Sequence, residues 1–222
     1  MHFDPDPSGA AQCASRLRRV PARRLPEPSD DEPLATQSAQ STSAASATAI
    51  VAGGCFWGVQ AVFLHLKGVR SAISGYSGGS AAEANYDAVC SGRTDHTEAV
   101  AITYDPSIIS YGSLLHIFFA IAHDPTELNR QGPDVGSQYR SAIFTTSASQ
   151  ERIANTYIDQ LNLAAAFPRP IMTQVLALEK FYAAEDYHQN YALQHPENPY
   201  VAIHDLPKLA QLAQHYPQKL KA

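Results

Sequence analysis

The sequence predicts an α+β fold in which a mixed β-sheet and the helices packed on it form two layers. Apolar residues make up 45% of the 222 residues, enough to bury a substantial core. Short apolar runs of strand length alternate with longer segments in which apolar residues recur at helical spacing. The predicted order is strand, helix, strand, strand, helix, strand, helix, strand. This order indicates a two-layer, ferredoxin-like sandwich.

Each element in the first half of the domain ends at a residue that stops strands or helices. Glycine and Asp-Pro pairs are such stop signals, because glycine adopts turn conformations and proline lacks a backbone donor. In chain order the expected elements are a strand at 49–52 before Gly53-Gly54, a helix at 56–66 before Gly68, a strand at 69–74 before the turn 75–79, and a strand at 99–104 before Asp105-Pro106.

The second half begins with a strongly apolar helix and continues through an unusual connection. Residues 123–138 are polar, contain Asp, Pro, Asn and Gly, and show no periodicity. Connections of that length in a compact domain are usually functional or disordered. The expected elements are a helix at 111–122, a strand at 141–145, a helix at 148–165, a strand at 172–178, and closing helices around 183–193 and 206–213.

The first 48 residues differ in composition from the rest. They hold six of the fifteen prolines, and Phe3 is their only aromatic residue. Such a segment cannot bury enough apolar surface to offset its ordering entropy, so residues 1–48 are expected to be a disordered extension. They lack the apolar centre of a secretory peptide, and an acidic patch at 30–32 argues against a transit peptide. An upstream start-codon artefact remains an alternative. The catalytic domain is expected to span residues 49–222.

Composition narrows the classes of function. The net charge of −5 argues against a nucleic-acid binder, and no apolar run approaches the length of a membrane span. Three cysteines without a Cys-x-x-Cys pair exclude a disulfide framework and a zinc ribbon, and no histidine pair has metal-ligand spacing. We therefore expect a soluble, cytoplasmic monomer without a metal and without membrane or nucleic-acid partners, since the sequence indicates no oligomer.

Cys55 follows a buried strand and two glycines and begins a helix. The unpaired N–H groups and the positive dipole end at that position favour a thiolate. Phe56 and Trp57 come next, and Trp57 is the only tryptophan. The pattern is typical of a nucleophile in an apolar pocket, although most free cysteines are small buried hydrophobic residues at tight turns.

Several polar residues elsewhere could assist such a nucleophile. Glu98 alternates with Val100 and Ile102 and is expected at the core side of its strand, where burial would raise its pKa and make it a proton donor. The alternative is an edge residue turned to water. Tyr86 and Tyr139 lie in irregular segments, where phenols can hydrogen-bond an oxygen that gains charge, but most tyrosines only pack. Asp134 lies in the long connection, where an aspartate more often caps a turn.

These residues belong to motifs that resemble one family. The pentapeptide Gly54-Cys55-Phe56-Trp57-Gly58 is similar to the signature of the peptide methionine sulfoxide reductase A family. The further motifs follow in the family's order, and together the resemblance covers residues 49–215. They are 75–79 (GYSGG), 89–92 (VCSG) after Tyr86, 96–100 (HTEAV), 123–125 (HDP), 129–132 (NRQG), 138–141 (QYRS) and 184–189 (AEDYHQ).

The resemblance implies a role for each matching residue. Cys55 would attack the sulfoxide sulfur, and Phe56 and Trp57 would form the wall that receives the substrate's methyl group. Glu98 would protonate the sulfoxide oxygen, Tyr86 and Tyr139 would hydrogen-bond it, and Asp134 would complete the polar floor. The implied products are methionine and a Cys55 sulfenic acid, with selectivity for the S epimer and no metal or organic cofactor. Oxidised proteins and free methionine sulfoxide would be the substrates, and repair of oxidative damage the purpose.

The chain departs from many members because no cysteine follows Cys90. A resolving cysteine in the C-terminal tail is therefore absent, and Cys90 is interpreted as structural, with resolution of the sulfenic acid by Cys90 or Cys13 as the alternative. A one-cysteine cycle would need an external thiol, either thioredoxin or glutaredoxin with glutathione. His188 is interpreted either as a residue that supports the site residues without contacting substrate or as a residue that packs a helix.

Two other functions are weighed against the reductase. Acyl transfer or peroxide reduction could use Cys55, but acyl transfer needs a histidine base near the thiol, and neither His96 nor His123 has a motif that indicates one. A module that binds methionine or its sulfoxide without turnover would not need Cys55 together with Glu98. Activity on a sulfoxide, but not on esters or peroxide, would separate these possibilities.

Overall fold

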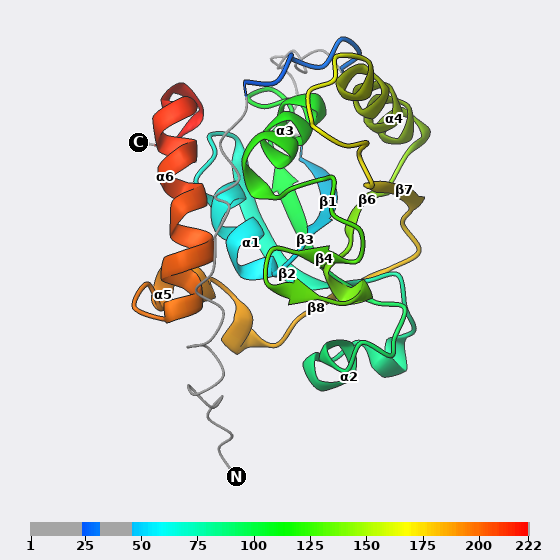
Figure 1. The fold of residues 1–222 in the computed structure, drawn as a ribbon, viewed down its shortest axis with the longest axis vertical. Coiled ribbons are helices and arrows are strands. Elements are labelled where there is room, and N and C mark those ends of the chain that lie inside the picture. The colour runs from blue at the N-terminus through cyan, green and yellow to red at the C-terminus, as the bar shows by residue number, and fades with distance from the viewer. Residues whose placement is uncertain (1–23, 32–45, 222) are drawn as a thin grey trace, which may run out of the picture.

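The computed structural model describes residues 24–31 and 46–221, and its architecture is the expected mixture of α and β (Figure 1). The strands are β1 (Ala47–Gly53), β2 (Val69–Ser77), β3 (Thr97–Tyr104), β4 (Arg130–Gln131), β5 (Asp134–Val135), β6 (Ser141–Thr145), β7 (Gln174–Ala177) and β8 (Phe181–Ala183). The helices are α1 (Phe56–Leu64), α2 (Tyr86–Cys90), α3 (Tyr111–Ile117), α4 (Ala148–Leu163), α5 (Tyr191–Gln194) and α6 (Leu206–His215), with π-helical turns at Phe118–Ala122 and Val201–Asp205.

Six strands form one mixed sheet in the order β7-β6-β1-β3-β2-β8. The neighbours from β6 to β8 are antiparallel, and only β6 and β7 run parallel. A mixed sheet was expected, and this part of the fold prediction is confirmed. The short strands β4 and β5 form a separate hairpin within the long polar connection.

The central strand β1 is buried on both faces. Ala49 and Val51 contribute to the main core, which also contains apolar residues of α1, α3 and α4. Ile50 and Ala52 point the opposite way into a smaller cluster that includes Phe144 of β6. Because successive side chains of a strand alternate between its faces, a continuous apolar run is required to fill both clusters.

The turn between β1 and α1 needs both of its glycines. Gly54 has a φ of +86°, and a Cβ there would lie 2.5 Å from Gln131. A Cβ on Gly53 would meet His123 and Phe118 at 3.0 Å. The backbone therefore reverses in very little space, and it delivers Cys55 to the start of α1 as the glycine pair predicts.

The prediction of one helix at 183–193 is wrong. Residues Phe181–Ala183 form strand β8, which pairs with Gly75–Ser77 because β2 runs three residues further than expected and leaves an unpaired edge. Asn190 then adopts a left-handed conformation with a φ of 58°, so only the single turn α5 follows. The sequence analysis also missed α2 and the β4–β5 hairpin, which are too short to show periodicity.

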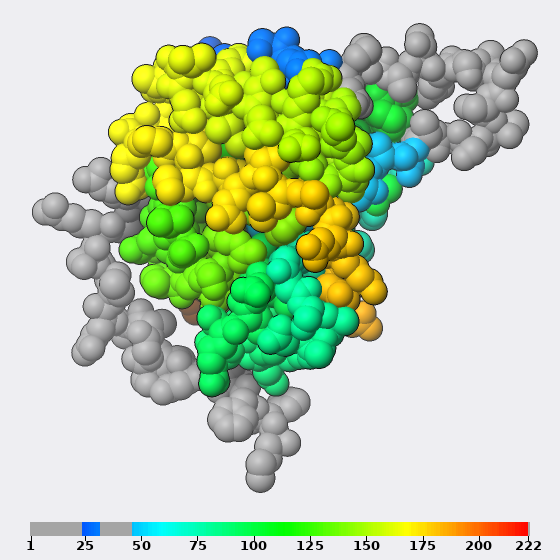
Figure 2. All heavy atoms as spheres, turned by 90° about the vertical axis from the view of Figure 1, so that its right-hand side faces the viewer, coloured from blue at the N-terminus to red at the C-terminus, as the bar shows by residue number. Residues whose placement is uncertain are grey.

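The expectation of disorder across residues 1–48 does not hold for residues 24–31. The Leu25 side chain is buried in the main core, and the Tyr157 hydroxyl donates to the Pro26 carbonyl at 2.9 Å. Asp31 accepts hydrogen bonds from the Ser110 hydroxyl and the Gly112 N–H at the start of α3. Figure 2 shows this segment in dark blue against the yellow-green surface of α4. Residues 46–48 of the extension are also described, and Ala47 and Thr48 belong to β1. The rest of the extension lies outside the described residues.

We expect Asp31→Ala to lower the free energy of unfolding by about 1 kcal/mol, because it removes the acceptor for two donors at the α3 N-terminus. Asp30→Ala is the matched control, since Asp30 pairs with Arg152 on the surface, where ion pairs contribute little. Urea unfolding of the full chain measures both. Equal losses in the two variants would show that docking of this segment on α3 adds no specific stability.

Candidate active site

Cys55 lies at the N-terminus of α1, between the glycine turn and Phe56. The residue as a whole is partly exposed, and the backbone N–H of Trp57 directs a hydrogen bond at the sulfur. Protein nevertheless encloses it on most sides, and burial, Glu98 and Asp205 raise its pKa well above the ordinary value. The expectation of a thiolate in the resting protein is therefore wrong. Desolvation and nearby carboxyl groups outweigh the helix N-terminus and its single N–H donor.

Glu98 on β3 is the buried acid that the strand pattern predicts, with 3% of its surface exposed. The Phe56 N–H donates to its Oε2 at 2.9 Å, so the carboxyl group is attached to the first turn of the helix that begins beside Cys55. Burial raises the pKa of Glu98 to about 8, and the charges of Asp134 and Asp205 add to the rise. At neutral pH the group is mostly protonated and able to donate a proton.

Tyr86 and Tyr139 are half-buried, and both lie close enough to Glu98 and Cys55 to be influenced by their charges. Burial is the main cause that raises the pKa of each phenol, so both hydroxyls stay protonated and can donate hydrogen bonds. The Tyr86 hydroxyl is engaged with the thiol of Cys90, one helical turn further along α2.

Trp57 and Phe56 occupy different depths. Phe56 is buried, whereas Trp57 is half-buried and stacks on Tyr191 with ring centroids 3.9 Å apart. The Trp57 indole N–H donates to Nδ1 of His188 at 3.1 Å, and the buried His188 ring also lies 4.3 Å from that of Tyr86. His188 thus connects the apolar and the hydroxyl-bearing sides of the site.

Asp134 lies at the start of β5 and accepts a hydrogen bond from the Tyr200 hydroxyl at 2.5 Å. Burial raises the pKa of Asp134. Its charge reaches both Cys55 and Glu98, so the long connection does bring this residue to the site. The structure therefore gathers the polar residues singled out in the sequence around one sulfur atom.

The sequence analysis missed a set of residues at the C-terminal end. Asp205 is completely buried, and Oδ2 has no hydrogen-bond partner. Its Oδ1 accepts from Lys208 at 3.3 Å and would lie 2.0 Å from a Cβ on Gly58, so only glycine lets it approach α1. An aspartate before Leu-Pro-Lys is typical of a helix start, so the sequence alone gives no reason to place Asp205 beside Cys55.

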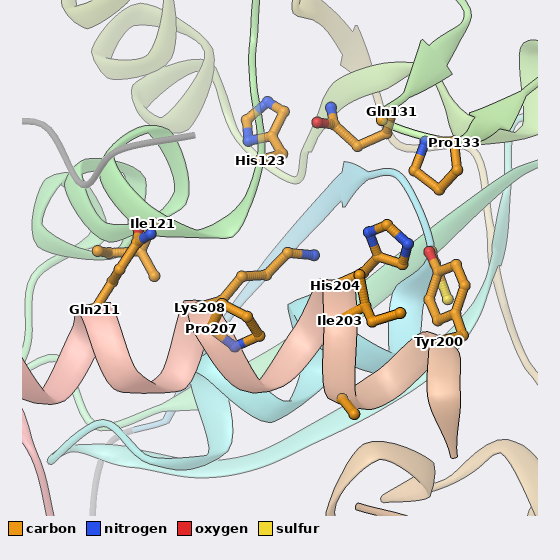
Figure 3. Close-up of a pocket in the computed structure, with 13 residues that line it drawn as sticks. Ile121, His123, Gln131, Pro133, Tyr200, Ile203, His204, Pro207, Lys208 and Gln211 are labelled. Atoms are coloured by element: carbon orange, nitrogen blue, oxygen red, sulfur yellow. The ribbon is translucent and has the colours of Figure 1, made fainter. Parts of the chain in front are cut away.

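A cavity of about 310 Å³ opens beside Cys55. Figure 3 shows it between the C-terminal helical segment, which carries Tyr200, His204 and Lys208, and the loop that carries Gln131 and Pro133. Over the described ranges, no group of three or more His, Cys, Asp or Glu side chains could hold a metal ion. No helix in those ranges is long and apolar enough to cross a membrane.

The chain is similar to known proteins of one family. Residues 47–220 match the family model of peptide methionine sulfoxide reductase. The chain is 50% identical to peptide methionine sulfoxide reductase MsrA 2 of Synechocystis over 89% of this chain and 91% of the relative. Among solved structures, reduced Mxr1 from Saccharomyces cerevisiae has a TM-score of 0.65 at 32% identity, covering 72% of this chain and 91% of Mxr1.

Methionine sulfoxide reductase A of Corynebacterium diphtheriae has a TM-score of 0.59 at 33% identity, covering 80% of this chain and 86% of that protein. The residues that match the family model include the elements that surround Cys55, which are β1, the glycine turn, α1 and β3. They also include the C-terminal segment. The chain therefore belongs to the peptide methionine sulfoxide reductase A family.

Proposed function

We propose that this protein reduces the S epimer of methionine sulfoxide, in oxidised proteins and as the free amino acid, through a sulfenic acid on Cys55. The observation that carries the proposal is the joint placement of a thiol and a protonated, buried carboxyl group at one helix N-terminus. A soft nucleophile and a proton donor are the two groups that cleavage of an S–O bond requires.

The remaining residues would hold the substrate. Trp57, with Phe56 behind it, supplies an apolar wall for the methyl group on sulfur. Tyr86 and Tyr139 would donate hydrogen bonds to the sulfoxide oxygen as negative charge develops on it. For Tyr86 this requires its hydroxyl to leave Cys90 when substrate arrives. Asp134, oriented by Tyr200, would complete the polar floor.

Proton transfer follows from the two raised pKa values. Glu98 gives its proton to the sulfoxide oxygen, and the carboxylate that results takes the proton of the Cys55 thiol as the sulfur forms its bond. The oxygen ends on Cys55 as a sulfenic acid, and methionine is released. The exchange balances, because one thiol and one sulfoxide become one sulfenic acid and one thioether.

Regeneration would use an external thiol. The cysteines of the chain are Cys13, Cys55 and Cys90, so the segment beyond Cys90 offers no resolving thiol. Burial raises the pKa of Cys90 to about 11, which makes it a poor nucleophile and supports a structural role. Thioredoxin, or glutaredoxin with glutathione, is proposed as the reductant.

We also propose domain bounds, a fold type and a cellular location for the protein. The catalytic domain would span residues 49–222 with residues 24–31 packed against it. A ferredoxin-like sandwich is supported by the order β6-β1-β3-β2 with antiparallel neighbours and by α1 and α3 in the connections. A cytoplasmic monomer that needs no metal or organic cofactor remains our expectation.

Acyl transfer is less well supported by the geometry. Both ring nitrogens of His123 are already engaged, one with the Phe118 carbonyl and the other with the Ser141 hydroxyl at 2.7 Å. Burial lowers the pKa of His123 to about 4, so it would be a weak base. His96 hydrogen-bonds the Ser80 carbonyl instead of approaching Cys55.

A single-turnover experiment tests the proposal directly. Fully reduced protein, mixed with excess S-epimer methionine sulfoxide and no reductant, is expected to release one methionine per chain and to gain about 16 Da as a trappable sulfenic acid. Cys55→Ser should release none, and Cys90→Ser should still form the adduct. A loss of about 2 Da would instead indicate a disulfide and a resolving role for Cys90 or Cys13. Absence of methionine would refute the reductase proposal.

Substitution of Glu98 should remove the proton donor. We expect Glu98→Gln to lower kcat by about 10²- to 10⁴-fold, the usual contribution of general acid catalysis. In the unsubstituted protein, kcat should fall as the pH rises above about 8, where Glu98 loses its proton, and this limb should vanish in the variant. Glu151→Gln, on the exposed surface of α4, is the control. Rates that are unchanged in Glu98→Gln would remove Glu98 from the mechanism.

The same substitution should stabilise the protein at alkaline pH. The pKa of Glu98 is higher in the folded state, about 8, than the roughly 4.3 of an unfolded glutamate, so the native state binds the proton more tightly. Stability from this group is complete below pH 4.3 and is lost as the pH rises towards 8. The glutamine keeps an acceptor for the Phe56 N–H. We expect the Tm of Glu98→Gln to exceed that of the parent by about 3 °C or more at pH 8.5, with the gap closing near pH 5.

A further inference from the structure

The cavity beside Cys55 shares that residue with the proposed sulfoxide site but is lined mostly by other residues. It is lined by Cys55 together with Tyr200, His204 and Lys208, and by Gln131 on the opposite wall (Figure 3). The residues proposed to hold the sulfoxide do not line it. Those residues are Phe56, Trp57, Tyr86, Glu98 and Tyr139. Cys55 therefore borders a cavity whose other wall is the C-terminal helical segment.

A second approach is what the regeneration step needs, on the assumption that the proposed function is correct. A thiolate displaces the hydroxyl of a sulfenic acid in line with the S–O bond, so it enters from the side opposite the oxygen. The oxygen arrives on Cys55 from the side of Glu98, which can then protonate it as it leaves. None of the proposed oxygen-binding residues lines the cavity, so a thiol bound in the cavity would reach Cys55 without displacing them.

The chemistry of the cavity favours an anion. Figure 3 shows the Lys208 side chain extending along it, between His123 and His204. None of its lining residues in the described ranges carries a carboxylate. Burial lowers the pKa values of His123 and His204, which leaves Lys208 as the cationic group there.

Two acids lie behind the cavity wall and must be counted against Lys208. Asp205 pairs with Lys208 at 3.3 Å, which fixes the lysine in position, and Asp205 itself does not line the cavity. Asp134 is engaged with the Tyr200 hydroxyl, and burial raises its pKa. The Lys208 side chain is 20% exposed and lines the cavity.

We infer that this cavity is the binding site of a low-molecular-weight thiol that carries a carboxylate, with the carboxylate paired to Lys208 and the sulfur directed at Cys55. The volume of about 310 Å³ is at the small end of ligand pockets, which fits a molecule of this class. The first thiolate forms an S–S bond with Cys55 as the S–O bond breaks, and the oxygen leaves as water with a proton from Glu98. A second thiolate then attacks the bound thiol's sulfur, which releases the small disulfide and returns Cys55 as a thiolate.

The test compares two small thiols on the preformed sulfenic acid. Single-turnover protein, freed of excess sulfoxide, is mixed with 3-mercaptopropionate or with the neutral 2-mercaptoethanol, and mixed-disulfide formation is followed by intact mass. For each protein the ratio of the two rate constants, corrected to the thiolate concentration, is the measured quantity. Differences in intrinsic thiol reactivity cancel when this ratio is compared between variants.

Lys208→Gln is expected to lower the ratio about 5- to 10-fold, the size of one partly desolvated charge pair. Lys208→Arg, which keeps the charge, should retain most of it. The matched control is Lys67→Gln, which makes the same change of net charge at an exposed lysine that donates to the Gln218 carbonyl. Its ratio should equal that of the parent.

The outcomes separate this inference from the proposed function. If the parent protein releases methionine but Lys208→Gln keeps the parent's ratio, the thiol site is wrong and the reductase proposal stands. An equal fall of the ratio in Lys67→Gln would reduce the effect to net charge and would also overturn the site. If only a protein dithiol regenerates Cys55, and neither small thiol reacts, the small-thiol assignment fails. If no methionine is released, the proposed function itself fails.

Discussion

The hydrogen bond from the Phe56 N–H to Glu98 joins the two halves of the site. It links the first turn of α1, which carries Cys55, to strand β3 in the centre of the sheet. The carboxyl group thereby gains a fixed position, and its burial raises its pKa to about 8. The backbone donor favours the charged form, but it is one donor against nearly complete desolvation. The position of the carboxyl group beside Cys55 therefore depends on this contact, whereas its protonation depends on burial.

This arrangement lowers the stability of the folded protein but supports the reactivity proposed for the site. A carboxyl group that keeps its proton at neutral pH is less favourable to fold around than an ionised one on the surface, and Asp134 and Asp205 place two more acids nearby. The surrounding structure compensates with a continuous core on one face of the sheet and with residues 24–31 docked on α3 and α4. Strain and charge at an active site are commonly supported in this way by the rest of the fold.

Short sequence patterns predicted the features that depend on residues close together in the chain. Gly53-Gly54 before Cys55 indicated a sharp turn into a helix, and the alternation that includes Glu98 indicated a buried carboxyl group. Tertiary contacts decided the rest. Leu25 lies in a proline-rich segment whose composition predicts disorder. In the structure it packs into the core cluster that includes residues of α4. Asp205 has the sequence of a helix start, and only the fold places it against Gly58.

The close approach at Gly58 has a consequence for how this protein could diversify. One missing carbon atom fixes the spacing between α1 and the segment that carries Asp205 and Lys208. Any larger residue at position 58 would push that segment outwards, without altering Cys55 or Glu98 themselves. The width of the cavity beside Cys55 thus depends on Gly58, a buried residue that does not line it. Substitutions in the interior of the protein could therefore change which reducing agents reach Cys55, while the surface of the protein stays the same.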